Sequence, residues 1–214
     1  MKLYFAPGAC SLSPHIVLRE AGLKFDLEQV DLATKKTKSG ADYWAVNSLG
    51  AVPTLQLDDG KLLTEGPAVV QYIADRNPGA GLAPAAGTFE RYQLQSVLNF
   101  ITSELHKGFS PLFASDTPDD YKTIAKKKLA NRFDELDRRL AGKQYLLGDR
   151  FSVADAYCFA IVSWVKYFGD YALDNTLGLG RLRAANRKIT PIYGPFSSFW
   201  PWISRALAGP SASL

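Results

Sequence analysis

The sequence predicts an α/β N-terminal domain followed by an all-α C-terminal domain. The first 80 residues alternate strand-like and helix-like segments, whereas helical periodicity dominates from residue 89 onward. Between them, the segment NPGAGLAPAAGT at 77–88 is rich in Pro, Gly and Ala and has no periodicity, which is typical of a linker. We therefore place the domains at 1–80 and 89–214, with the linker at 81–88.

Each element of the first domain has a local signal. Lys2–Phe5 is a short apolar strand candidate, and Ser13 followed by Pro14 predicts an N-cap and a first helical residue. That helix should end near Gly22. Phe25–Val30 alternates apolar and polar residues, which indicates a second strand.

A hairpin and a helix complete the first domain. Thr54–Leu57 and Lys61–Leu63 flank Asp58-Asp59-Gly60, a strong hairpin signal. Glu65-Gly66-Pro67 then opens a helix that continues through Ile73. The order is βαβ followed by ββα, which predicts a thioredoxin-like arrangement.

The second domain should contain helices over 89–113, about 120–141, and 152–168. Ser152 and Asp155 form a variant of the capping box, which we assign to folding. Cys158 lies in an apolar run and should be a buried structural residue.

The composition is that of a globular protein and argues against a disulfide-rich or membrane-spanning one. The chain is 47% hydrophobic and 12% aromatic, as expected for a globular protein. Two cysteines are too few for a disulfide framework, and no apolar run reaches the ~20 residues that span a bilayer. The N-terminus lacks the long apolar stretch of a cleavable signal, so we expect a cytoplasmic protein without a membrane partner.

The net charge of +4 does not predict a nucleic-acid partner. Residues 1–165 carry 19 Lys and Arg against 19 Asp and Glu, and residues 166–214 carry 6 against 2. A neutral body with a mildly basic tail lacks the footprint of a phosphate-backbone binder.

Cys10 and Ser11 lie in the loop before the first predicted helix. A helix start offers free backbone N–H groups, which favour a thiolate. Because Ser13 replaces a second cysteine, no dithiol cycle is expected, while a monothiol mixed disulfide stays open. So does a purely structural role for Cys10 as a small loop residue.

Two backbone features suggest a peptide site. If the Val52–Pro53 bond is cis, Val52 presents an unpaired strand edge to which an extended peptide can add; a trans proline at a strand start is the alternative. The N–H groups of Glu65 and Gly66 suit a ligand carboxylate, and Glu65 suits an ammonium group. Alternatively, Glu65 only complements the helix dipole, which contributes ~0.3–1 kcal/mol.

Asn99, Ser103 and His106 are spaced by four and three residues, so a regular helix places them on one face. A polar face that ends in a histidine is typical of a cleft wall. The alternative is a structural histidine.

Five motifs in order resemble those of the bacterial β-class glutathione transferases. They are PGACS at 7–11, AVP at 51–53, TEG at 64–66, SELHKGF at 103–109 and GDRFSVADAY at 148–157. The resemblance covers residues 1–165 and implies the glutathione transferase fold and a detoxification enzyme. It also implies a homodimer, glutathione as co-substrate, a hydrophobic electrophile as second substrate, and no metal.

The resemblance also implies roles for individual residues. Val52 beside a cis Pro53 pairs with the glutathione backbone, Glu65 and Gly66 hold its γ-glutamyl end, and Lys35 lies near its glycine end. The glutathione sulfur is surrounded by Cys10, Ser11, His106 and Lys107. Asn99, Ser103 and Glu104 reach glutathione bound to the other subunit.

The sequence departs from the family in two places. Tyr4 is followed by Phe5, so no strand tyrosine is assigned as an activator. Residues 166–214 are rich in Gly, Pro and aromatic residues and are atypical for the family.

The sequence is therefore compatible with three functions. In the first, the glutathione thiolate attacks an electrophilic carbon. In the second, Cys10 itself acts as the nucleophile of a thiol transferase or peroxidase. In the third, the protein binds glutathione or a hydrophobic ligand without catalysis.

Overall fold

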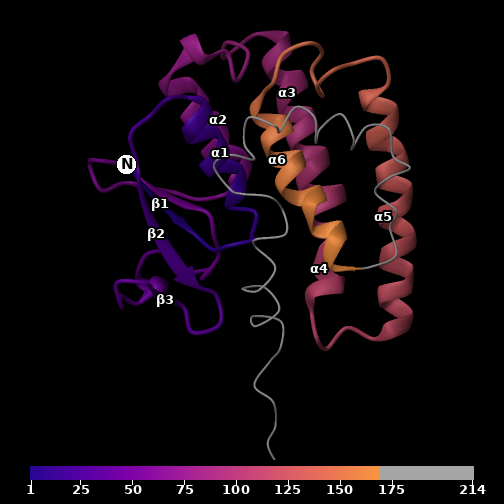
Figure 1. Ribbon diagram of the computed structural model, residues 1–214, viewed down its shortest axis with the longest axis horizontal. Helices are drawn as coiled ribbons and strands as arrows, with labels where there is room; N and C mark the ends of the chain where they lie inside the picture. Colours follow the sequence, from indigo (N-terminus) through magenta and orange to yellow (C-terminus); the bar gives the residue numbers. More distant parts are fainter. Residues whose placement is uncertain (169–214) are drawn as a thin grey trace, which may run out of the picture.

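The computed structural model describes residues 1–168, and a mixed sheet with its helices lies beside a bundle of longer helices (Figure 1). The sheet has the strand order β3-β2-β1-β4-β5. β1 pairs in parallel with β2, and the other neighbouring strands pair antiparallel. The strands are β1 (Lys2–Phe5), β2 (Asp26–Asp31), β3 (Lys36–Thr37), β4 (Thr54–Gln56) and β5 (Leu62–Leu63).

The predicted strands are confirmed to within one or two residues at their ends. The hairpin forms as expected, with Leu55 opposite Leu63 across its two strands. The sequence analysis missed β3, because two residues are too short to show alternation. The βαβ–ββα order of a thioredoxin-like domain is therefore present, with β3 added at one edge of the sheet.

Two helices of this domain, α1 (Leu12–Glu20) and α2 (Gly66–Arg76), pack against each other. The predicted start of α1 at Ser13 and Pro14 is wrong, because the helix begins at Leu12 with Ser11 as its N-cap residue. The two additional residues are stabilised by the loop: the Ser13 hydroxyl donates to the Cys10 carbonyl at 2.9 Å. Pro14 fits there because N–H groups in the first turn have no partner within the helix.

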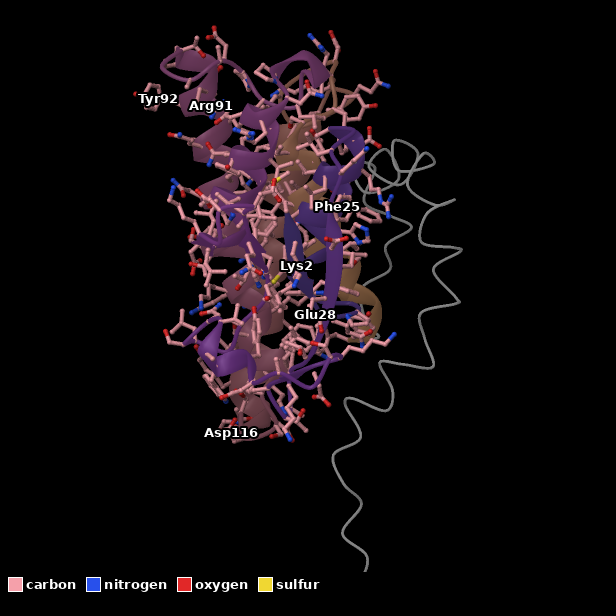
Figure 2. All side chains as sticks on the ribbon, turned by 90° about the vertical axis from the view of Figure 1, so that its left-hand side faces the viewer. Lys2, Phe25, Glu28, Arg91, Tyr92 and Asp116 are labelled. Atoms are coloured by element: carbon pink, nitrogen blue, oxygen red, sulfur yellow. The ribbon has the colours of Figure 1, made fainter. Side chains whose placement is uncertain are left out.

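The second part of the chain is helical, as predicted. The helical run predicted over 89–113 exists, but its middle third is a π-helical turn. Arg91, near the start of this run, and Asp116, just past its end, lie at opposite ends of the molecule (Figure 2). The elements are α3 (Phe89–Phe100), the π turn (Ile101–His106), α4 (Lys107–Phe113), α5 (Asp119–Leu140), α6 (Val153–Val162) and a 3₁₀ turn (Ser163–Tyr167).

Helix α6 joins the two parts, because every residue of it is buried and it packs against α1, α2 and α3. The capping box at its start is confirmed: the Asp155 carboxylate accepts from Ser152 N–H at 2.9 Å and from Leu146 N–H at 2.8 Å. Cys158 is fully buried in the core, also as predicted. The side chains that α6 carries are therefore held rigidly against the first domain.

Among the described residues, no helix is long and apolar enough to cross a membrane. The residues from 169 onward, which include most of the atypical 166–214 segment, lie outside the described part of the chain.

Candidate functional site

The loop before α1 brings Cys10 to Val52. The Cys10 thiol donates to the Val52 carbonyl at 3.2 Å, although the two residues are 42 positions apart. Ser11 closes the loop behind it, since its hydroxyl donates to the Ala6 carbonyl at 3.2 Å and accepts from the Ala6 N–H at 3.1 Å. The loop thus holds the Cys10 sulfur next to the segment that leads into β4.

The expectation that this position favours a thiolate is wrong for the unliganded protein. Burial raises the pKa of Cys10 to about 12, and the negative charge of Glu65 adds to the rise. The backbone N–H groups of Cys10 and Ser11 oppose it but do not compensate. The sequence shows the helix start, whereas the burial that outweighs it comes from tertiary packing. Cys10 is therefore a neutral S–H donor.

The Val52–Pro53 peptide bond is cis, which was the alternative that the resemblance favoured. Val52 lies outside the strands, and its N–H has no hydrogen-bond acceptor among residues 1–168. Its carbonyl faces the Cys10 thiol. A backbone N–H without an acceptor among residues 1–168, next to a carbonyl held only by a weak S–H donor, is what an added extended peptide can pair with.

A buried polar cluster holds the backbone just before Val52. The Tyr43 hydroxyl and the Asn47 side-chain amide both donate to the Ala51 carbonyl at 2.8 Å. The same two groups contact the Thr54 hydroxyl, at 2.8 and 3.2 Å. This cluster fixes the direction in which the Val52 N–H points.

Helix α2 supplies further free donors at its first turn. Glu65 is its N-cap residue, and its φ of 66° is a left-handed conformation that non-glycine residues rarely adopt. Such backbone conformations concentrate at ligand sites. Because Pro67 has no N–H, the free donors of this turn come from residues such as Gly66. The arrangement is suited to a carboxylate.

Lys35 lies at the other end of the Val52 segment. Its Nζ donates to the Gly50 carbonyl at 2.9 Å and lies 5.6 Å from the Trp44 ring centroid. A side chain at Gly50 would collide with the Trp44 ring, since a Cβ there would lie 2.8 Å from it. The structure thus brings the predicted Lys35, Val52 and Cys10 to the same end of the sheet, where β1 and β2 end and β4 begins.

His106 faces the site from the helical part. Its Nδ1 lies 2.7 Å from the Tyr157 hydroxyl, and its ring packs edge-on against Trp164 with centroids 5.0 Å apart. The Trp164 indole N–H donates at 2.8 Å to the carbonyl of Gly8, two residues before Cys10. Burial lowers the pKa of His106 to about 4, and the neighbouring Lys107 lowers it further, so the ring is neutral at pH 7.

The single face predicted for Asn99, Ser103 and His106 does not hold. Asn99 and Ser103 are exposed, and the Ser103 hydroxyl donates to the Asn99 carbonyl at 3.0 Å. His106 instead turns inward toward Tyr157. The reason is the π turn over Ile101–His106, which widens the helix and changes the rotation per residue.

Two predicted residues near His106 lie farther out. Glu104 forms an ion pair with Arg132 on α5, and Lys107 is exposed. The structure therefore separates an inner group that contains His106 from an outer group on α3, the π turn and the first residue of α4. The outer group is Asn99, Ser103, Glu104 and Lys107.

Sequence reasoning missed three residues that shape the site: Tyr43, Tyr157 and Trp164. Each has a polar tip on a large apolar body and is nearly or fully buried. A buried tyrosine or tryptophan usually needs a hydrogen-bond partner. For Tyr157, its position inside the apolar run of α6 was the available signal. Which partner each one finds depends on the fold.

Comparison with known proteins matches both parts of the chain to one family. The N-terminal domain model of glutathione S-transferases matches residues 8–76, and the C-terminal domain model matches residues 100–177. The chain is 47% identical over 164 residues to glutathione S-transferase GstA of Escherichia coli O157:H7, covering 77% of this chain and 82% of that one.

Solved structures give the same picture. The ternary complex of BphK, a bacterial glutathione S-transferase, is 52% identical with a TM-score of 0.84, over 97% of this chain and 98% of that one. The β-class glutathione S-transferase of Sphingomonas chungbukensis is 43% identical with a TM-score of 0.84, over 97% of both chains. With both of its domains matched in order, the chain belongs to the glutathione S-transferase family, as its motifs predicted.

Proposed function

We propose that this glutathione transferase binds glutathione along the Val52 edge, and that the glutathione thiolate forms a bond to an electrophilic carbon of a hydrophobic substrate as the leaving group of that carbon departs. The free N–H of Val52, beside the Cys10 thiol, is the observation that carries the proposal. The cysteinyl residue of glutathione pairs with Val52. The γ-glutamyl end then reaches Glu65 and Gly66, and the glycine end reaches Lys35.

The sulfur in this pose lies between Cys10 and His106. The predicted donation from the Ser11 hydroxyl does not apply, because that hydroxyl is buried and donates its proton to the Ala6 carbonyl. A glutathione thiol with a pKa near 8.5 is mostly protonated at pH 7. Lowering that pKa by about two units requires ~2.7 kcal/mol of preferential thiolate stabilisation. One hydrogen bond to a charged acceptor contributes about 1.5–3 kcal/mol, so one or two donors suffice.

Cys10 acts here as a donor to the glutathione sulfur and not as the nucleophile. Because its pKa is raised, the Cys10 thiol stays protonated at neutral pH. A protonated thiol can donate a hydrogen bond, whereas a nucleophile has to be a thiolate. When the peptide pairs with Val52, the carbonyl gains a second partner and the S–H is free to turn to the incoming sulfur. The burial of Cys10 thus favours conjugation over disulfide exchange.

The electrophile is proposed to bind against the aromatic cluster next to His106. Trp164 and Phe113 pack edge-on at 5.1 Å, and Phe113 is more than one-third exposed. An exposed aromatic surface beside the reacting sulfur suits a hydrophobic substrate and a role in detoxification. We further propose a cytoplasmic homodimer in which the exposed Asn99, Ser103 and Glu104 reach glutathione in the other subunit.

For the domain organisation we propose residues 1–80 as the glutathione-binding domain, 81–88 as the linker and 89–214 as the helical domain. The hydrogen bond from Val153 N–H to the Leu82 carbonyl, at 2.9 Å, ties the linker to the start of α6.

Titration of the bound glutathione thiol tests the proposal. Ultraviolet absorbance of the thiolate should give a pKa about two units below that of free glutathione. An unshifted pKa would contradict the activation mechanism.

Replacing Cys10 by Ala separates conjugation from the Cys10-nucleophile alternative. Conjugation should partly survive in Cys10→Ala, because His106 and backbone N–H groups remain. A loss of all conjugation together with all glutathione-disulfide exchange would instead favour the thiol transferase. Tight glutathione binding without turnover of any electrophile would favour a non-catalytic binder.

A further inference from the structure

The strongest unassigned contact of the site is between Tyr157 and His106. Tyr157 lies on α6 with 2% of its surface exposed, and its hydroxyl oxygen is 2.7 Å from His106 Nδ1. A Cβ on Gly66 would lie 3.7 Å from the same tyrosine ring. Tyr157 therefore stands between the first turn of α2 and His106, on a helix that is buried throughout.

The neighbouring Thr102 hydroxyl does not take the tyrosine proton. Thr102 Oγ1 donates its proton to the Leu98 carbonyl at 2.9 Å and lies 3.4 Å from the Tyr157 oxygen. The longer contact is too weak to compete for the tyrosine proton with the 2.7 Å contact to His106. Tyr157 is thus the donor and His106 Nδ1 the acceptor.

We propose that the Tyr157 hydroxyl is a positioning group that holds His106 in the tautomer with its proton on Nε2, directing that N–H at the glutathione sulfur. A neutral imidazole has one donor and one acceptor nitrogen, so occupying Nδ1 as acceptor leaves Nε2 as the donor. No described residue accepts a hydrogen bond from Nε2. The catalytic part of this inference rests on the proposed function, whereas the tautomer itself does not.

The protonation of both groups is consistent with this assignment. Burial lowers the pKa of His106 to about 4, so the ring is neutral in working conditions. Burial also raises the pKa of Tyr157, so its hydroxyl keeps the proton that it donates. A tyrosine with this role does not activate the thiol directly and needs no place on the first strand.

Nitrogen-15 NMR of the histidine side chains tests the tautomer directly. The chain has only His15 and His106, so a His106→Gln variant assigns the two rings. Wild-type protein without glutathione should show His106 neutral with its proton on Nε2. A proton on Nδ1 in wild-type protein would overturn the proposal, whatever the enzyme's activity.

The variant Tyr157→Phe removes the hydroxyl and keeps the ring. We expect a population with the proton on Nδ1 to appear, kcat to fall by about 3- to 10-fold, and KM for glutathione to change by less than about twofold. An unchanged tautomer with unchanged kcat would overturn the proposal. Should the variant fail to fold, the wild-type spectrum still decides.

The matched control is Thr102→Val, which removes the neighbouring hydroxyl but not the donor to His106. Its tautomer and kcat should equal those of wild type. If Thr102→Val lowers kcat as much as Tyr157→Phe, the effect is one of general packing and the proposal falls. If wild-type protein shows the expected tautomer but conjugates no electrophile, the proposed function fails and the tautomer assignment stands.

Discussion

The two walls of the site recognise a ligand by different means. The wall from the first domain offers backbone groups, chiefly the N–H of Val52 and the first turn of α2. The wall from the helical part offers side chains, with His106 held by Tyr157 and packed on Trp164. Backbone groups depend on the path of the chain, whereas side-chain groups depend on residue identity. Substitutions should therefore act differently on the two walls.

One side chain joins the walls. The Trp164 indole donates to the Gly8 carbonyl from 156 residues away, and its ring contacts His106, Phe109 and Phe113. Because Trp164 contacts both His106 and the backbone of the loop that carries Cys10, the two walls share one support. Breaking that support should harm both stability and chemistry.

Trp164→Ala should have the largest effect on both stability and activity, because this residue contacts both walls. Removing a buried tryptophan costs about 3–5 kcal/mol of unfolding free energy. Activity should fall further than His106 substitution alone explains, because the loop that holds Cys10 also loses an anchor. Urea unfolding and the kcat for a chloroaromatic substrate measure the two effects.

Trp164→Phe is the control for Trp164→Ala. It keeps most of the packing and loses the hydrogen bond to Gly8, which costs about 0.5–1.5 kcal/mol. Equal losses of stability in both variants would mean that the hydrogen bond alone joins the walls. Wild-type stability in Trp164→Ala would contradict the shared support altogether.

The backbone wall was the more predictable of the two. Glu65-Gly66-Pro67 is a local signal, since a helix start is set by neighbouring residues. Pro53 marks its position in the sequence as well, but only the family resemblance favoured the cis form of the Val52–Pro53 bond. Their placement beside Cys10 then follows from the strand order. The start of α1 was misplaced because the hydrogen bonds of the Cys10 loop, which extend the helix, are not visible in a pattern of residue types.

The side-chain wall was less predictable because burial decides its chemistry. Cys10 has a helix start that favours a thiolate, yet burial raises its pKa to about 12. His106 could be placed on a helix but not oriented, since the π turn rotates it away from Ser103. Tyr157 had no assigned role because nothing in its own segment shows that His106 lies opposite. Long-range packing sets all three properties.

Acid should destabilise the protein through its two histidines. Burial lowers the pKa of both His15 and His106 to about 4. The folded state therefore binds fewer protons than the unfolded state between pH 6.5 and 4. The contribution of each histidine is fully present above about pH 6.5 and is lost as pH falls toward 4.

Urea unfolding at pH 7.5 and pH 5.0 measures this loss. After a discount for partial exposure, we expect about 1 kcal/mol from each histidine, or ~2 kcal/mol together. The variant His106→Gln should lose about half of the pH dependence. If stability rises as the pH falls from 7.5 to 5.0, and His106→Gln abolishes that rise, His106 is protonated in the folded protein and a neutral His106 donor is excluded.

Val52→Ala should have the smallest effect on catalysis, and it tests the backbone wall most directly. Val52 is 8% exposed and packs in a small cluster with Tyr4, Val30 and Tyr43. Removing two methyl groups from this cluster should lower the unfolding free energy by about 1–2 kcal/mol. KM for glutathione should stay within about twofold of wild type, because the N–H and carbonyl of residue 52 are unchanged.

Gly66→Ala is the matched variant at the second backbone site. A Cβ there meets the Tyr157 ring at an ordinary contact distance of 3.7 Å, so it too should leave KM for glutathione nearly unchanged. A tenfold rise in KM for Val52→Ala, with Gly66→Ala unaffected, would mean that the valine side chain itself contacts the peptide. In that case the wall from the first domain also binds the ligand through a side chain, as the helical wall does, and the contrast between backbone and side-chain recognition disappears.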